Sequence, residues 1–276
     1  MYVIFTDLDG TLLDHETYGW EEALPALDLC RRLDVPIILV SSKTRAEIDV
    51  FRNQLGLSAP FISENGGGIF FPKEGTPDAP PGTAPFGDAW KWSLGQPYEV
   101  LVHSLKQIRE ALGWNIRGFS DMTLEEISRL TGLDLESCRL AAQREYDEPF
   151  VVLGQGDDLD MGPLHAAARQ RGLFMTSGGR FHHLQGKNDK GVAVGKLISW
   201  YQERSPRVTS MALGDSPNDF SMLKRVHHPV LVRSSREFPG LSGEIPGLRT
   251  TWESGPRGWN EAVLYILKGK SKGGTV

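Results

Sequence analysis

The stretch FTDLDGTLLD, residues 5–14, places three aspartates directly behind the apolar run 2–5. That run predicts a buried strand over 2–6. Desolvating a carboxylate is costly and two neighbouring carboxylates repel each other, so Asp7 and Asp9 at a strand exit need compensating charge. A calcium loop or helix caps are the alternatives, but Gly10 arrives too early for an EF-hand loop. Asp14 is interpreted as a cap or turn residue.

The composition limits the kinds of partner. Lys and Arg total 30 against 35 Asp and Glu, a net charge of −5, which gives no sign of a nucleic-acid surface or a membrane-binding basic patch. The first residues show no signal peptide, and no apolar run approaches the roughly 20 residues of a membrane span. We therefore expect a cytoplasmic protein. Cys30 and Cys138 are then two buried thiols, with a disulfide as the alternative.

Strand and helix patterns alternate at both ends of the chain. They predict strands at 2–6, 35–40, 60–63, 209–213 and 229–232, and helices at 20–33, 44–55, 191–202 and 218–224. The run VPIILV at 35–40 is continuously apolar, as in strands covered on both faces. This alternation predicts an α/β fold with a doubly wound, Rossmann-like parallel sheet.

The pattern breaks in the middle of the chain. The proline-rich stretch 72–97 is interpreted as a connecting loop. An α+β block follows, with helices at 99–112, 123–131, 135–144 and 161–171 and strands at 150–153, 173–176 and 181–184. We therefore expect a core of residues 1–83 and 186–276 and an inserted α+β domain of residues 84–185.

A second acidic cluster lies in MALGDSPNDFSML, residues 211–223. An apolar strand again ends in glycine and then acid, and Asp219 falls at a helix start, where it can also serve only as a cap. The carboxyl ends of parallel strands share one edge of a sheet, so Asp215 is expected close to Asp7 and Asp9. Such an all-oxygen site suits Mg²⁺.

Two further segments are weaker signals when taken alone. In ILVSSKTR, residues 38–45, Ser41 follows its strand directly, and a hydroxyl with helix-start amides forms a phosphate cradle. Serines at a helix start are also ordinary caps. In GKNDKGVAV, residues 186–194, Lys190 opens a helix, where most lysines are surface residues.

In this order, strand-DxDGT, strand-Ser, Lys-Gly-helix and strand-GDxxND resemble the haloacid-dehalogenase superfamily of phosphotransferases over the whole chain. The resemblance implies that Asp7 is the nucleophile that becomes aspartyl-phosphate and that Asp9 is the general acid and base. It implies that Ser41 binds the transferring phosphoryl group and that Lys190 neutralises charge on that group and on Asp7.

The resemblance also implies a Mg²⁺ cofactor. Its ligands are the Asp7 carboxylate, the Asp9 backbone carbonyl and Asp215, while Asp219 orders a metal-bound water or ligates weakly. A carboxylate that attacks a phosphate dianion needs such a cation and a lysine to offset the repulsion. The insertion lies where the sugar-phosphate branch of the superfamily carries an α+β cap, which excludes water and recognises the leaving group.

Four stretches are more specific: SSKTRAEI, FISENGGGIF, AAQREYDEPF and GGRFHHLQGKNDKG resemble mannosyl-3-phosphoglycerate phosphatases. This implies a small phosphorylated glycoside as substrate and mannosylglycerate as product. The substrate-binding candidates are Ser42, Lys43, Asn65 and Asn218 in the core, and Arg144, Glu148, Ser177, Gly178, Gly179 and Arg180 in the cap.

Several alternatives stay open at this point. Arg144 and Glu148 can instead form a helix-end ion pair, and Arg180 can be a surface residue of a turn. One of His182 and His183 packs and the other faces the cleft. Glucosyl-3-phosphoglycerate and other sugar phosphates are alternative substrates, and a phosphomutase shares the same core. A non-catalytic sugar-phosphate sensor or protein-binding module would be expected to lack one or more of Asp7, Asp9, Lys190 and Asp215, and all four are present.

Overall fold

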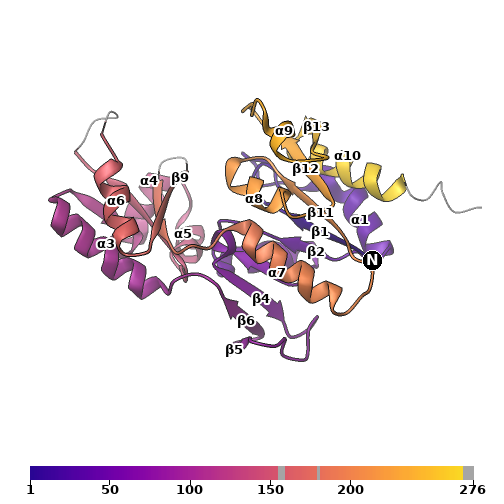
Figure 1. The fold of residues 1–276 in the computed structure, drawn as a ribbon, viewed down its shortest axis with the longest axis horizontal. Coiled ribbons are helices and arrows are strands. Elements are labelled where there is room, and N and C mark those ends of the chain that lie inside the picture. Colours follow the sequence, from indigo (N-terminus) through magenta and orange to yellow (C-terminus); the bar gives the residue numbers. More distant parts are fainter. Residues whose placement is uncertain (155–158, 179–180, 270–276) are drawn as a thin grey trace, which may run out of the picture.

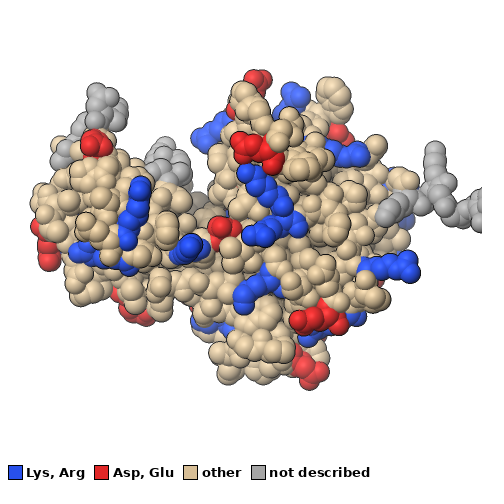
Figure 2. All heavy atoms as spheres, viewed as in Figure 1, with Lys and Arg blue, Asp and Glu red and all other residues tan. Residues whose placement is uncertain are grey.

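A computed structural model describes residues 1–154, 159–178 and 181–269. It has two units, a larger core unit built on a parallel sheet and a smaller cap unit inserted into it (Figure 1). On the face shown in Figure 2, basic and acidic side chains are interspersed over both units, and a groove separates the two lobes. No helix in the described ranges combines the length and apolarity needed to span a membrane.

The core sheet has five parallel strands in the order β13-β12-β11-β1-β2. The strands are β1 (Tyr2–Thr6), β2 (Ile37–Leu39), β11 (Thr209–Gly214), β12 (His228–Arg233) and β13 (Arg249–Ser254). Ile4 of β1 packs into one hydrophobic cluster, whereas Val3 and Phe5 pack into the cluster on the opposite face. Both faces are buried, which explains the continuous apolar runs and confirms the predicted fold class.

Helices cover both faces of this sheet. They are α1 (Leu24–Arg32), α2 (Arg45–Leu55), α7 (Lys190–Gln202), α8 (Phe220–Leu223), α9 (Leu241–Glu244) and α10 (Gly255–Lys268), with short 3-10 turns at Glu21–Ala23, Glu64–Gly66 and Pro217–Asp219. At the start of α2, Thr44 and Glu47 cap each other's backbone N–H groups. This capping box fixes the direction in which the chain leaves the end of β2.

An antiparallel sheet extends the core unit in the order β3-β4-β6-β5. Its strands are β3 (Phe61–Ser63), β4 (Gly68–Pro72), β5 (Ala84–Phe86) and β6 (Ala89–Ser93), and a bridge between Val40 and Ile62 joins it to β2. The interpretation of 72–97 as a loop was therefore wrong. Its prolines hide the strand pattern, because Pro85 lies on the edge strand β5, where a missing N–H is tolerated.

The cap unit has a four-stranded antiparallel sheet in the order β7-β8-β10-β9. It comprises α3 (Tyr98–Leu112), β7 (Ile116–Gly118), a 3-10 turn (Phe119–Asp121), α4 (Leu124–Thr131), α5 (Leu135–Ala141), β8 (Asp147–Val152), α6 (Gly162–Gln170), β9 (Phe174–Gly178) and β10 (Phe181–Gln185). Leu184 packs in a cluster with α3 and α6, and Phe181 packs in another with α4 and α5. An odd separation along β10 places these two on opposite faces of the sheet.

The expected domain boundary at 83/84 falls inside the antiparallel extension. Because β5 and β6 pair with β4, and Trp90 and Trp92 pack against the core cluster, we propose that the chain leaves the core unit near 94–97. The return near 186 stays a prediction. Cys30 and Cys138 are both buried free thiols, as expected, and lie in different units.

Candidate active site

Three of the predicted residues follow neighbouring strands of the core sheet. Thr6 of β1 is in register with Leu39 of β2 and with Leu213 of β11. Asp7, Ser41 and Asp215 therefore leave the sheet at the same edge, within one or two residues of that register. This is where ligands bind in open α/β sheets, so the topology turns three distant sequence motifs into one site.

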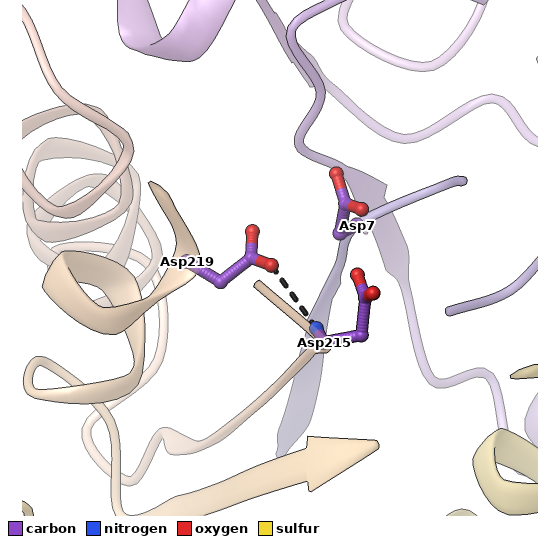
Figure 3. Close-up of side chains that lie close together, drawn as sticks. All are labelled: Asp7, Asp215 and Asp219. Carbon is purple, nitrogen blue, oxygen red and sulfur yellow. Dashed lines mark hydrogen bonds between the residues drawn. The ribbon is translucent and has the colours of Figure 1, made fainter. Parts of the chain in front are cut away.

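Asp7, Asp215 and Asp219 form a compact group of carboxylates. Each offers an oxygen, and these oxygens all lie within 4.8 Å of one another (Figure 3). Asp7 and Asp219 are buried, and Asp215 is partly buried. A cluster of carboxylate oxygens without sulfur or imidazole is a donor set for a hard divalent cation.

Lys190 balances part of this negative charge. It is fully buried at the first position of α7, and its Nζ lies 2.6 Å from Oδ1 of Asp7 and 2.6 Å from Oδ1 of Asp219. A surface role for Lys190 is thereby excluded. A buried ammonium group between two carboxylates is the arrangement that burying all three charges requires.

Asp219 has both of its oxygens engaged. Its Oδ1 accepts from Lys190, and its Oδ2 accepts from the backbone N–H groups of Asp215 and Ser216, each at 3.1 Å. It also belongs to a capping box with Ser216, so the cap interpretation and the site interpretation both hold. Asp219 thus fixes Lys190 and the backbone of Asp215 at once.

Gly10 allows the first acidic loop to pass close to the second. Its φ is +73°, and a Cβ at this position would lie 3.0 Å from Oδ2 of Asp215. The next residue, Thr11, donates to Oδ1 of Asp215 at 3.3 Å. A larger residue at position 10 would therefore be strained and would also press on the metal-binding candidate.

The Asp9 side chain has a different environment from that of Asp7. Its Oδ2 lies 3.0 Å from Nζ of Lys43, and its buried Oδ1 accepts no hydrogen bond from the described residues. Nζ of Lys43 also lies 5.1 Å from the centre of the Tyr18 ring. Lys43, predicted to bind substrate, is thus the group that orients Asp9. Asp14 accepts from Thr17 in a turn, as interpreted.

Burial changes the acidity of the two central carboxylates. Desolvation raises the pKa of Asp7 to about 8, with Lys190 opposing and Asp219 reinforcing that rise. Desolvation, with the nearby charge of Asp219, also raises the pKa of Asp215 to about 6. A divalent cation between them would favour the charged forms and lower both pKa values. The residues present therefore fit a bound Mg²⁺.

The phosphate-cradle candidates lie in residues 41–43, between β2 and α2, named here the phosphate-cradle loop. The hydroxyl of Ser41, which is buried, accepts from the backbone N–H of Lys43 at 3.2 Å. The Ser42 carbonyl accepts from Nη1 of Arg144 at 3.1 Å, a contact between the core and cap units. Across the site, Nδ2 of Asn218 donates to Oδ1 of Asn65 at 3.1 Å, which links the turn after β3 to the second acidic loop.

The two charged cap candidates do not pair with each other. Nη1 of Arg144 lies 3.4 Å from Oδ2 of Asp147, whereas Oε1 of the fully buried Glu148 accepts from the hydroxyl and the N–H of Ser120. A helix-end ion pair between Arg144 and Glu148 is therefore excluded. Because Arg144 also binds the Ser42 carbonyl, it joins the cap unit directly to the phosphate-cradle loop.

The structure separates the two histidines. His182 packs against Phe150 with ring centres 5.4 Å apart, on the sheet face that carries α3 and α6. His183 points to the opposite face, where its Nδ1 lies 2.7 Å from Oδ2 of Asp147. His183 and Arg144 both contact Asp147, and Arg144 also contacts the Ser42 carbonyl. His183 is therefore the histidine on the face of the cap sheet that is turned toward the Ser42 loop, and His182 is the one that packs.

Two of the cap candidates, Ser177 and Gly178, lie at the end of β9. The backbone of Ser177 pairs with His182 and that of Gly178 pairs with Phe181. Gly179 and Arg180 lie outside the described residues. Their assignment to substrate binding stays a prediction.

Sequence reasoning missed two buried acids at the junction of the units, Asp147 and Glu64. The Glu64 carboxylate accepts from the backbone N–H groups of Glu145 and Tyr146, and desolvation raises its pKa to about 8. The signal for Glu64 was present, because this acid directly follows the strand β3, as Asp7 follows β1. For Asp147, the sequence offered only a charged run.

Comparisons with known proteins agree with this geometry. A family model described as haloacid dehalogenase-like hydrolase matches residues 4–77. A protein of Methanococcoides burtonii named glucosyl-3-phosphoglycerate/mannosyl-3-phosphoglycerate phosphatase is 40% identical over 266 residues, 96% of this chain and 97% of that one. A protein of the same name from Persephonella marina is 36% identical over 281 residues, 98% and 99% of the two chains.

A solved structure shares the fold. It is a phosphatase of the haloalkanoate (HAD) superfamily from Bacteroides thetaiotaomicron, with a TM-score of 0.66 at 15% identity over 98% of this chain and 95% of that one. The chain therefore belongs to the haloacid dehalogenase-like hydrolases, the class that its fold and its strand-end carboxylates define. Within that class it is a phosphomonoester hydrolase, as its motifs implied.

Proposed function

We propose that this phosphatase hydrolyses mannosyl-3-phosphoglycerate to mannosylglycerate and inorganic phosphate, with glucosyl-3-phosphoglycerate as an alternative substrate. The observation that carries the proposal is Lys190 buried between Asp7 and Asp219, in a chain 40% identical to a phosphatase named for both substrates. The double name is the reason to keep the glucosyl substrate. We further propose that the reaction takes place in the cytoplasm, where Cys30 and Cys138 stay reduced.

In the first step, a carboxylate oxygen of Asp7 attacks phosphorus and the bond from phosphorus to the glycerate oxygen breaks. Lys190, 2.6 Å from Asp7, offsets the repulsion between the carboxylate and the phosphate dianion. The product on the enzyme is an aspartyl-phosphate, and the glycoside leaves as an alkoxide that must gain a proton.

Asp9 supplies that proton in our proposal. Its Oδ2 pairs with Lys43, its side chain is not part of the cluster of Asp7, Asp215 and Asp219, and its buried Oδ1 has no donor among the described residues. In the second step Asp9 takes a proton from water, and this water attacks the phosphorus of aspartyl-phosphate and restores Asp7. The Ser41 hydroxyl, at the end of β2, contacts the phosphoryl oxygens in both steps.

The metal in this proposal is Mg²⁺, held by the carboxylates of Asp7 and Asp215 and the backbone carbonyl of Asp9. When bound, it supplies positive charge beside the transferring phosphoryl group. Asp219 remains a candidate for a weak ligand or for the partner of a metal-bound water, and its oxygens also accept from Lys190 and from the 215–216 backbone. These hydrogen bonds give it the further role of positioning Lys190 and Asp215.

The cap unit covers the leaving group in this proposal. Arg144 lies between the Ser42 carbonyl and Asp147, and His183 lies on the same face. A substrate with a phosphate, a carboxylate and a hexose needs cations and hydroxyl partners beyond the phosphate site. Ser42, Asn65, Asn218, Arg144, Glu148 and residues 177–180 remain our candidates for those contacts.

A phosphate-release screen tests the proposal. The purified protein is assayed with mannosyl- and glucosyl-3-phosphoglycerate and with the phosphates of mannose, glucose and sucrose, with Mg²⁺ or with EDTA. We expect the phosphoglycerate glycosides to be hydrolysed fastest and only with Mg²⁺. Equal rates on all five substrates would refute the proposed preference for phosphoglycerate glycosides. Phosphate release that requires a sugar bisphosphate as activator would indicate a phosphomutase instead. The Asp7→Asn variant is the control for contaminating phosphatase.

A further inference from the structure

The turn 64–67, which follows β3, is bound to the phosphate-cradle loop. The backbone N–H of Glu64 donates to the carbonyl of Lys43, and that of Asn65 donates to the carbonyl of Ser41, both at 3.0 Å. Oδ1 of Asn65 accepts from Nδ2 of Asn218. The turn thus contacts the loop of Ser41 and the loop that carries Asp215.

The same turn also binds the cap unit and both connecting segments. Oε2 of Glu64 accepts from the N–H of Tyr146 at 2.8 Å, and Oε1 accepts from the N–H of Glu145 at 3.0 Å. The Glu64 carbonyl accepts from Nδ2 of Asn188 at 3.3 Å on the returning segment. The Gly67 carbonyl accepts from the N–H groups of 94 and 95 on the outgoing segment.

The conformation of the turn is unusual and closely confined. Glu64 and Asn65 have φ values of 47° and 53°, in the left-handed region that side chains other than glycine rarely adopt. A Cβ on Gly67 would lie 2.3 Å from Cβ of Tyr146, and one on Gly66 would lie 2.2 Å from the Asp189 carbonyl oxygen. The turn therefore also packs against the residue before Lys190.

We propose that Glu64 is a positioning residue that holds the cap unit in register with the phosphate-cradle loop. Its backbone binds the core loop, and its side chain, which is fully buried, accepts from the N–H groups of the two residues just before the cap strand β8. Substrates that extend from the phosphate site to the cap depend on this register, and small phosphate esters do not. The identity of the large substrate rests on the proposed function.

The side chain can be removed without touching the core contacts, because those use the Glu64 backbone. We would measure kcat and KM of Glu64→Ala and Glu64→Gln with mannosyl-3-phosphoglycerate and with p-nitrophenyl phosphate, in the presence of Mg²⁺. Glu64→Ala should raise KM for the glycoside about 10-fold or more, with p-nitrophenyl phosphate kinetics within about 2-fold of wild type. Glu64→Gln keeps one acceptor oxygen and should be intermediate.

Amide hydrogen exchange provides a readout that is independent of substrate identity. The N–H groups of Glu145 and Tyr146 should exchange faster in Glu64→Gln than in wild type, while those of α4 should not change. If no phosphoglycerate glycoside is a substrate, the proposed function fails, and this measurement still decides whether Glu64 holds the cap segment. Unchanged exchange at 145 and 146 overturns the proposal even if Glu64→Ala does not fold.

Glu145→Gln is the matched control at the same junction. The Glu145 side chain lies 3.0 Å from Lys91 and is partly exposed, and its substitution leaves the backbone N–H to Glu64 in place. We expect wild-type kinetics with both substrates. An effect of Glu145→Gln equal to that of Glu64→Ala, or equal losses on both substrates in Glu64→Ala, would overturn the positioning role.

Discussion

The core and cap units use charged residues in different ways. In the core unit, Lys190 bridges Asp7 and Asp219 with side chains that are 0%, 9% and 0% exposed. In the cap unit, Arg109 pairs with Asp121 at 2.7 Å, with side chains that are 31% and 22% exposed. The N···O distances are similar, 2.6 Å for both contacts of Lys190 and 2.7 Å for Arg109 with Asp121. The ion pairs of the two units therefore differ in solvation and not in distance.

This difference in solvation determines how much each kind of ion pair contributes to stability. Partly exposed pairs contribute little to stability, because water already solvates their charges. Buried groups lose that solvation, and such networks are poor stabilisers compared with apolar packing of the same volume. We therefore attribute the buried lysine and its two aspartates at the end of a parallel sheet to the proposed phosphate chemistry, because stability alone does not account for them.

The strongest test of this comparison removes the nucleophile. Asp7→Asn should lower the rate of phosphate release by at least about 10⁴-fold, since an amide does not attack phosphorus. The fold should persist, because asparagine has the same shape as aspartate and carries no charge. Burial already disfavours the charged form of Asp7, since it raises the pKa to about 8. Phosphate-release assays and circular dichroism provide the measurements. A variant with more than a few per cent of wild-type activity would refute the assignment of Asp7.

Removing the lysine should affect both activity and stability. Lys190→Met leaves Asp7 and Asp219 buried without their shared cation, which costs about 3–5 kcal/mol of the free energy of unfolding by analogy with other broken buried pairs. Thermal unfolding of the metal-free protein measures this loss. Part of the stability should return in the double variant Asp7→Asn/Lys190→Met, and a double variant no more stable than Lys190→Met would contradict the pairing.

The sequence was sufficient to predict which candidate residues meet at one end of the core sheet. Apolar runs located the strands that precede Asp7, Ser41 and Asp215, and the parallel topology then placed those residues at one edge. The last strand, β13, was not predicted. It is an edge strand in which Thr251 is buried and Trp252 is 82% exposed, so its apolar pattern is weak.

Sequence patterns did not predict the contacts between the core and cap units. Arg144 appeared as one cation in a charged run, and only the folded chain places it between Asp147 and the Ser42 carbonyl. Glu64 directly follows a short strand, the same pattern as Asp7, yet its partners are backbone N–H groups some 80 residues away. Partner identity of this kind depends on how two units dock.

The buried Glu64 should make the stability of the folded protein depend on pH. Desolvation raises its pKa from 4.5 to about 8, with Arg144 opposing and Asp147 reinforcing the rise, and the N–H donors of 145 and 146 opposing it. The folded protein then keeps a proton that the unfolded chain releases. Its contribution to stability is fully present below pH 4.5 and is lost as the pH rises through about 8.

Glu64→Gln removes this titration and leaves every other titrating group in place. The decline of unfolding free energy between pH 5 and pH 8 should therefore be shallower in Glu64→Gln than in wild type. Urea unfolding of both proteins at several pH values measures the two slopes. Parallel slopes would mean that Glu64 ionises normally in the folded protein, and its burial would need another explanation.

The smallest effect should come from the cap pair that opened the comparison. Arg109→Gln removes the contact with Asp121, and because both side chains are partly exposed we expect a loss below about 1 kcal/mol, with unchanged phosphate release. Thermal unfolding and the phosphate assay provide the measurements. A loss of unfolding free energy as large as that of Lys190→Met would show that solvation does not distinguish the buried from the partly exposed ion pairs. The argument that the buried network serves the proposed chemistry would then fail.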